Sequence, residues 1–145
     1  MSTFTRQELE RAFEHHDQIA LAQDWNAYTD LFTPDGVYVE HHFGVFTGRD
    51  AIRAWLVPIM EPLANAGWEY PTDWVVFDGD RVVYRWWNRL PNPDGRARPY
   101  QFPGITVLQY AGDDLWSFQE DFYNWEEVEA TLSDYTAGIE RGKSA

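Results

Sequence analysis

Closely spaced turn signals in the second half of the chain separate segments of alternating polarity, and this pattern constrains the fold most strongly. Asp78-Gly79, Asn92-Pro93-Asp94-Gly95 and Gly112-Asp113-Asp114 each mark a reversal of the chain. An Asp-Gly pair between alternating apolar runs is a strong hairpin signal. The sequence therefore predicts a meander of antiparallel strands, at residues 74–77, 82–88, 105–110 and 115–123.

Helical periodicity precedes this meander. Thr5 and Glu8 have capping-box spacing, and the apolar residues that follow recur on one helical face. A second short helix is expected at 25–32. The third begins after Thr47-Gly48-Arg49-Asp50, and Pro58 and Pro62 are expected to kink it or cut it short.

Between the second and third helices, the turn Thr33-Pro34-Asp35-Gly36 leads into a predicted strand at 37–41, with 43–46 as its hairpin partner. A C-terminal helix is expected around 128–135, and residues 1–4 and 138–145 are expected to fray. Helices followed by a meander predict a single α+β domain over 1–145, with helices on one face of a curved sheet.

Composition limits the classes of partner. The chain has 145 residues, 11 Lys+Arg against 24 Asp+Glu, and a net charge of −13, which repels nucleic-acid phosphates and anionic membranes. It contains no cysteine and no long apolar run, so we expect a cytoplasmic protein without disulfides. The 25 aromatic residues, which comprise 8 Trp, 8 Tyr and 9 Phe, either fill a core or line an apolar pocket.

All four histidines lie in two Glu-His-His triplets, at 14–16 and 40–42. On a helical wheel His16 falls inside the apolar stripe of the first helix, whereas His15 lies roughly 100° away. Neighbouring side chains diverge on a helix or a strand, so neither pair chelates one metal through both rings. A set of His16, His41 and Glu120 is the conceivable metal site, but no metal-binding spacing supports it, and we expect no metal and no cofactor.

Glu120 is the candidate acid. Strict alternation along 115–123 places Trp116, Phe118, Glu120 and Phe122 on one face, so a single carboxylate is expected within an aromatic row. Glu120 is therefore expected to be buried or half-buried. A carboxylate in that position is either ion-paired, with Arg85 as the obvious partner, or has a raised pKa suited to proton transfer. The strand at 82–88 presents either Arg85 and Trp87 or Tyr84, Trp86 and Asn88 to the interior, and alternation alone leaves both faces open.

Two stretches, DWNAYTDLFTPDGVYVEHHFGVFTGRDAIRAW at 24–55 and ITVLQYAGDDLWSFQEDFYN at 105–124, resemble the nuclear-transport-factor-two-like superfamily. This α+β cone includes ketosteroid isomerase, scytalone dehydratase, limonene epoxide hydrolase and the SnoaL-like polyketide cyclases. The resemblance implies a cone-shaped domain, with N-terminal helices packed on a strongly curved, mostly antiparallel sheet. It also implies a homodimer that forms through the open face of the sheet.

The resemblance also implies catalytic roles for individual residues of this chain. His41 falls where ketosteroid isomerase has its catalytic base, His16 where it has an oxyanion donor, and Thr106 near its second donor. Glu120 matches an acidic position of limonene epoxide hydrolase and of some cyclases. The hydrolase's Arg-x-Asp motif reads Arg85-Trp86-Trp87 here, which argues against epoxide hydrolysis.

The scytalone dehydratase Tyr-Asp pair is likewise replaced, by Ala20-Leu21. Because His16 is expected to face inward, His41 to lie at a strand end and Glu120 to lie among aromatic residues, we expect a cofactor-independent acid–base enzyme. It would be of isomerase, lyase (dehydratase), cyclase or hydrolase type and would act on a small, largely apolar molecule that is uncharged or cationic. The alternative is a non-catalytic binding or dimerisation module of the same fold. The candidate catalytic residues are His41, Glu120 and His16, and the candidate substrate-binding residues are Arg85, Trp87, Tyr38, Trp116, Phe118 and Thr106.

Overall fold

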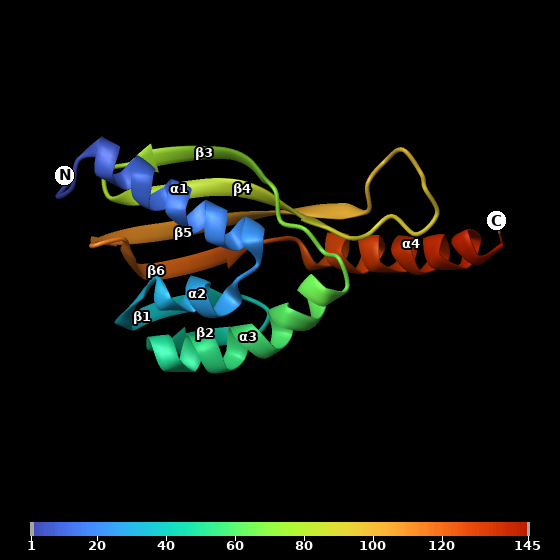
Figure 1. The fold of residues 1–145 in the computed structure, drawn as a ribbon, viewed down its shortest axis with the longest axis horizontal. Helices are drawn as coiled ribbons and strands as arrows, with labels where there is room; N and C mark the ends of the chain where they lie inside the picture. Colours follow the sequence, from blue (N-terminus) through green and yellow to red (C-terminus); the bar gives the residue numbers. More distant parts are fainter. Residues whose placement is uncertain (1, 145) are drawn as a thin grey trace.

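The computed structural model describes residues 2–144, which form an α+β domain built on one six-stranded curved sheet (Figure 1). The strand order is β2-β1-β6-β5-β4-β3. Adjacent strands are antiparallel except for β1 and β6, which run parallel. The strands are β1 (Phe32–Glu40), β2 (Gly44–Thr47), β3 (Thr72–Asp78), β4 (Arg81–Arg89), β5 (Gln101–Gly112) and β6 (Leu115–Phe122).

Three helices precede or interrupt the strands, and one follows them. Helices α1 (Arg6–Ala22), α2 (Trp25–Asp30) and α3 (Arg49–Asn65) lie against one side of the sheet, and α4 (Trp125–Lys143) extends beyond the sheet (Figure 1). The Thr5 hydroxyl caps α1 by accepting from the Glu8 N–H, as the capping box predicts. The predicted α+β class and the order of elements are confirmed.

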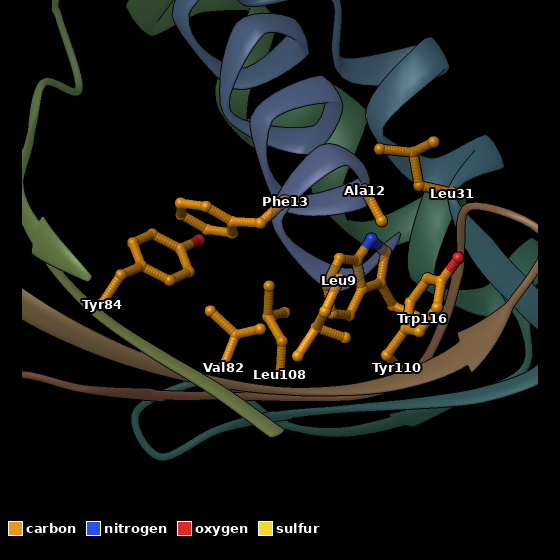
Figure 2. Packing of buried hydrophobic residues seen from close by; sticks show 9 residues of the cluster. All are labelled: Leu9, Ala12, Phe13, Leu31, Val82, Tyr84, Leu108, Tyr110 and Trp116. Atoms are coloured by element: carbon orange, nitrogen blue, oxygen red, sulfur yellow. The ribbon is translucent and has the colours of Figure 1, made fainter. Parts of the chain in front are cut away.

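The main core lies between the apolar face of α1 and the centre of the sheet (Figure 2). Leu9, Ala12 and Phe13 recur at helical spacing and face the inward residues of β4 and β5. These contacts fix α1 against the sheet, and the helix covers part of the concave face. The cluster comprises Leu9, Ala12, Phe13, Leu31, Val82, Tyr84, Leu108, Tyr110 and Trp116.

The chain is more continuous than expected at two places. Pro58 and Pro62 do not cut α3 short: the helix continues to Asn65, because both prolines lie on its exposed face, where the carbonyls that lose their partners are open to solvent. At the N-terminus, the N–H groups of Thr3 and Phe4 donate to the Asp80 carboxylate, so this segment is tied to the β3–β4 turn.

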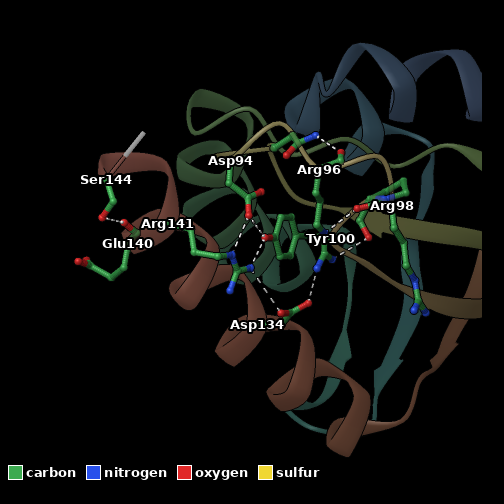
Figure 3. Close-up of polar contacts among 10 residues, drawn as sticks. Asp94, Arg96, Arg98, Tyr100, Asp134, Glu140, Arg141 and Ser144 are labelled. Carbon is green, nitrogen blue, oxygen red and sulfur yellow. Dashed lines mark hydrogen bonds and ion pairs between the residues drawn. The ribbon is translucent and has the colours of Figure 1, made fainter.

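The C-terminal segment also stays ordered, contrary to the expected fraying from Gly138. Figure 3 shows Arg141 of α4 donating to Asp94 and to the Tyr100 hydroxyl, at 3.0 and 2.9 Å. Arg96 lies over the Tyr100 ring and donates to Asp134 of α4 at 2.7 Å. These contacts fasten the long β4–β5 connection to α4, and the helix continues to Lys143. Met1 and Ala145 lie outside the described residues.

Candidate functional site

A cavity of about 270 Å³ opens between the concave face of the sheet and the helices. All four helices contribute to its wall, together with inward residues of β1, β4, β5 and β6. About half of the lining side chains are aromatic, and the polar residues gather on the sheet. The aromatic residues are Trp25, Tyr28, Tyr38, Phe43, Trp55, Trp68, Tyr70, Tyr84, Trp86, Phe102, Tyr123 and Trp125.

Asp121 of β6 is the central polar group of this cavity, and its side chain is 7% exposed. Its carboxylate accepts hydrogen bonds from Thr106 Oγ1 at 2.7 Å and from Gln119 Nε2 at 3.0 Å. The Tyr38 hydroxyl donates to the other carboxylate oxygen in a short contact. Burial raises the pKa of Asp121, the three donors oppose the rise, and the charge of nearby Glu40 adds to it.

The donors to Asp121 are themselves oriented by further hydrogen bonds. Trp86 Nε1 donates to Thr106 Oγ1 at 2.8 Å, so the Thr106 hydroxyl hydrogen is left for Asp121. The Gln119 amide also donates to the Tyr38 hydroxyl at 3.0 Å and accepts from the Tyr28 hydroxyl at 2.7 Å. Asp121 is therefore held at the end of a directed network rather than in an ion pair.

The buried tyrosines of the network stay protonated. Burial raises the pKa of Tyr28, of Tyr38 and of Tyr84 above the ordinary phenol value, with the charge of Asp121 adding to the effect. Neutral phenols donate hydrogen bonds, so this wall of the cavity presents donors at neutral pH.

Glu40 is the second buried carboxylate of the cavity and is 5% exposed. It lies at the register partner of Asp121 across the parallel β1–β6 pair. The Tyr123 hydroxyl donates to its two oxygens at 3.0 and 2.9 Å, and the backbone N–H of His42 donates at 2.8 Å. Two carboxyl groups thus stand side by side on the inner face of the sheet.

His41 and Glu120 lie together, but not in the cavity. His41 Nε2 is 2.7 Å from Glu120 Oε2, with the two side chains 55% and 25% exposed, on the face of the sheet opposite to Asp121. Glu120 is half-buried, as expected, but a β-bulge turns it to the outer face of the sheet, away from the cavity. Gln109 pairs with Phe118 while Tyr110 pairs with Trp116, so Ser117 is an extra residue and the alternation changes face there.

The same bulge explains the other positions on β6. Trp116 is buried in the core beside α1, whereas Phe118 shares the outer face with Glu120. Gln119 and Asp121, which strict alternation assigns to the opposite face from Trp116, are the residues that line the cavity. Strict alternation does group Asp121 with Gln119, but it predicts that both point away from the face of Trp116. The bulge reverses this and turns both toward the cavity.

Strand β4 turns Tyr84, Trp86 and Asn88 inward. Arg85 donates to Asp73 at 2.6 Å and lies 4.3 Å from the ring centre of Trp87, so these two expected substrate-binding residues occupy the outer face. The proposed Arg85–Glu120 pair is not formed. Tyr38 and Thr106 do line the cavity, next to Asp121.

His16 faces inward as the helical wheel predicts, and it lies in the core without lining the cavity. Its ring packs 4.8 Å from Tyr28 and 5.8 Å from Trp116, centre to centre, and its Nδ1 has no hydrogen-bond partner within residues 2–144. Burial, followed by the charge of His15, lowers the pKa of His16 to about 3. The structure thus brings His41 to Glu120 on one face and leaves His16 on the other.

Among residues 2–144, no group of three or more histidine, aspartate or glutamate side chains is placed to hold a metal ion. The same residues include no helix long and apolar enough to cross a membrane.

The family model of the SnoaL-like domain matches residues 9–118, so the chain belongs to the SnoaL-like domain family. No curated protein sequence matches the chain. Solved structures share the fold at low identity. An epoxide hydrolase resembling limonene epoxide hydrolase, from Mycobacterium tuberculosis, is 17% identical with a TM-score of 0.70, over 92% of this chain and 90% of that one.

Two further neighbours extend the comparison. A putative SnoaL-like polyketide cyclase from Shewanella denitrificans is 14% identical with a TM-score of 0.66, over 89% of this chain and 99% of that one. A protein of ketosteroid-isomerase-like fold from Catenulispora acidiphila, in complex with trimethylamine, is 23% identical with a TM-score of 0.61, over 88% and 93%. These identities show the fold alone.

Proposed function

We propose that this protein is a cofactor-independent acid–base enzyme that acts on a small, largely apolar molecule in the aromatic cavity. The observation that carries the proposal is Asp121, a buried carboxylate that faces the cavity and is held by three neutral donors. Burial raises the pKa of Asp121 above its ordinary value, which makes the carboxylate a stronger base than an exposed aspartate.

In this proposal Asp121 removes a proton from a carbon of the bound molecule and returns it elsewhere. Negative charge that develops on a substrate oxygen is stabilised by neutral donors, for which the Asn88 amide and the Tyr70 hydroxyl of the cavity wall are placed; among residues 2–144 that hydroxyl has no other hydrogen-bond partner. Aromatic walls exclude water and hold the apolar part of the substrate. Isomerisation, aldol-type cyclisation and dehydration all use these parts.

The neighbours support this class without selecting a reaction. Their names include a polyketide cyclase and an epoxide hydrolase, and one was solved with trimethylamine, a small amine. All are proteins of this fold with less than a quarter of their residues identical to this chain. They support a small-molecule site, and the reaction itself rests on Asp121 and its network.

The test is proton exchange at carbon, which requires no knowledge of the product. Small apolar ketones are first screened for binding by NMR shifts of tryptophan indole N–H signals, and those that bind are incubated with the protein in D2O. Deuterium incorporation at the carbon next to the carbonyl is expected with the wild type and is expected to be lost in Asp121→Asn. Bound ketones that exchange no faster than in buffer would identify a binding module instead.

The outer face of the sheet supports a second proposal, that of a homodimer. Trp74, Val76 and Phe122 expose large apolar side chains there, at 42%, 53% and 44%. Apolar patches of this kind mark association surfaces. Analytical ultracentrifugation of the wild type and of Trp74→Glu is expected to give a dimer and a monomer, respectively.

A further inference from the structure

Within residues 2–144, the side chains that line the cavity include acidic groups and no basic one. Asp17, Glu40 and Asp121 contribute carboxylates to its wall, and no arginine, lysine or histidine of this part of the chain lines it. The arginines nearest along the strands, Arg85 and Arg89, point to the other face and bind Asp73 and Gln101 there. The acidic charge of the interior therefore has no counter-charge from this chain's lining side chains.

Two of these carboxylates are also adjacent. Glu40 and Asp121 are register partners in the β1–β6 pair, and each is less than a tenth exposed. Their hydrogen-bond partners are all neutral, namely tyrosine, threonine and amide donors together with a backbone N–H. Buried carboxylates are ordinarily paired with a cation, since an unpaired buried charge costs several kcal/mol. Two adjacent carboxyl groups without a cationic partner among the lining side chains of residues 2–144 thus border a cavity of about 270 Å³.

The rest of the wall suits an organic cation. Indole rings attract cations through their faces more strongly than the other aromatic side chains do, and Trp25, Trp55, Trp68, Trp86 and Trp125 all line the cavity. Trp55 is fixed as a wall by stacking on Phe46 at 4.2 Å. Strongly hydrated inorganic cations gain little from such walls, whereas alkylammonium groups present both positive charge and apolar surface.

We propose that the cavity binds a small organic ammonium ion, with its charge beside Glu40 and Asp121 and its alkyl groups against the tryptophans. This proposal rests on the proposed function and names its substrate class, a small molecule that carries a tertiary or quaternary amine. The competing possibility is that Glu40 and Asp121 share one proton, as adjacent carboxyl groups do when no cation is available. The shared proton would leave the cavity suited to neutral ligands.

A matched pair of probes separates these two possibilities. Choline and 3,3-dimethylbutan-1-ol have the same shape and differ in having a quaternary nitrogen or a quaternary carbon at the same position. Dissociation constants are measured at pH 7 from indole N–H shifts. Choline is expected to bind at least ten times more tightly. Equal or tighter binding of the alcohol would overturn the proposal, as would the failure of both probes to saturate the protein at millimolar concentration.

Charge-removing variants test whether the preference for choline over 3,3-dimethylbutan-1-ol comes from the cavity carboxylates. Glu40→Gln removes one carboxylate charge from the cavity and is expected to lower the choline preference at least fivefold. Glu14→Gln makes the same charge change on the exposed face of α1 and is expected to keep the preference. A preference that survives in Glu40→Gln and also in Asp121→Asn would overturn the assignment. Circular dichroism verifies the fold of each variant, and the wild-type ratio decides the ligand class by itself.

The binding experiment and the exchange experiment can fail independently. Preference for choline without proton exchange on any bound ketone would leave a cation-binding module and remove the proposed enzyme. Exchange on neutral ketones combined with no preference for choline would keep the enzyme and remove the cationic substrate.

Discussion

His16 offers a direct test of how the buried interior responds to pH. The imidazole is 2% exposed and packs among aromatic rings, with no hydrogen-bond partner at Nδ1. Burial lowers its pKa from 6.5 to about 3, so the folded protein keeps the ring neutral where the unfolded chain protonates it. The neutral ring therefore contributes stability at neutral pH, and that stability is lost as pH falls below 6.5.

The magnitude follows from the width of this pH window. Between pH 6.5 and pH 5 the unfolded state takes up a proton that the folded state does not. Each pH unit in this window changes the free energy of unfolding by about 1.4 kcal/mol, so acidification to pH 5 costs about 2 kcal/mol through His16 alone.

His16→Phe removes the titrating group and keeps an aromatic ring in the slot beside Tyr28. Urea unfolding followed by tryptophan fluorescence at pH 7 and pH 5 gives the free energy of unfolding for each protein. At pH 7 the variant is expected to lie within about 1.5 kcal/mol of the wild type. On acidification to pH 5 it should lose about 2 kcal/mol less than the wild type does.

The matched control is His15→Gln, which changes the exposed neighbour in the same triplet. This variant should follow the wild-type pH dependence. If His16→Phe loses as much stability on acidification as the wild type does, or if His15→Gln gives the larger effect, His16 is not the group that titrates in this pH window.

Three further outcomes follow from the packing and from the buried carboxylate. A Cβ at Gly104 would collide with the ring of Trp86, so Gly104→Ala should lower the free energy of unfolding by about 1–3 kcal/mol and weaken ketone binding. Gly138 lies on α4, away from the cavity, and a Cβ there would collide with the Tyr100 hydroxyl. Gly138→Ala should therefore lower the free energy of unfolding in urea by a similar amount without changing ketone affinity. Unchanged stability in either variant would contradict the packing. Because burial raises the pKa of Asp121, the exchange rate should rise with pH around a midpoint above the ordinary aspartate pKa of about 3.9, and a midpoint below it would contradict the assignment.

The fold could be predicted because its signals are local. The Asp78-Gly79 turn forms the β3–β4 hairpin as expected, and the periodicity of Leu9, Ala12 and Phe13 places α1 on the sheet. The continuation of α4 past Gly138 could not be predicted in the same way. It depends on Arg141 reaching a loop some 45 residues earlier in the chain, which no local pattern records.

The site was predicted only in part, for a geometric reason. Alternation on a strand groups residues by face but does not say which face is concave, and one extra residue at Ser117 exchanges the two groups. Trp116 was rightly placed inside, and the bulge then turned Asp121 rather than Glu120 to the cavity. The resemblance likewise implied a catalytic role for His41, but His41 faces outward, and its neighbour Glu40 is the residue of β1 that lines the cavity.

Asp121 is proposed to transfer the proton, and its neighbour Glu120 provides the sharpest comparison. Each variant replaces one carboxyl group of β6 by an amide. Asp121→Asn does so on the inner face, and Glu120→Gln does so on the outer face. The measurement is the rate of deuterium incorporation into one ketone that exchanges with the wild type, at saturating ketone concentration. Asp121→Asn should lose a factor of roughly 100 or more, as expected for the loss of an acid–base group, while Glu120→Gln stays near the wild-type rate. A large loss in Glu120→Gln with activity retained in Asp121→Asn would contradict the account.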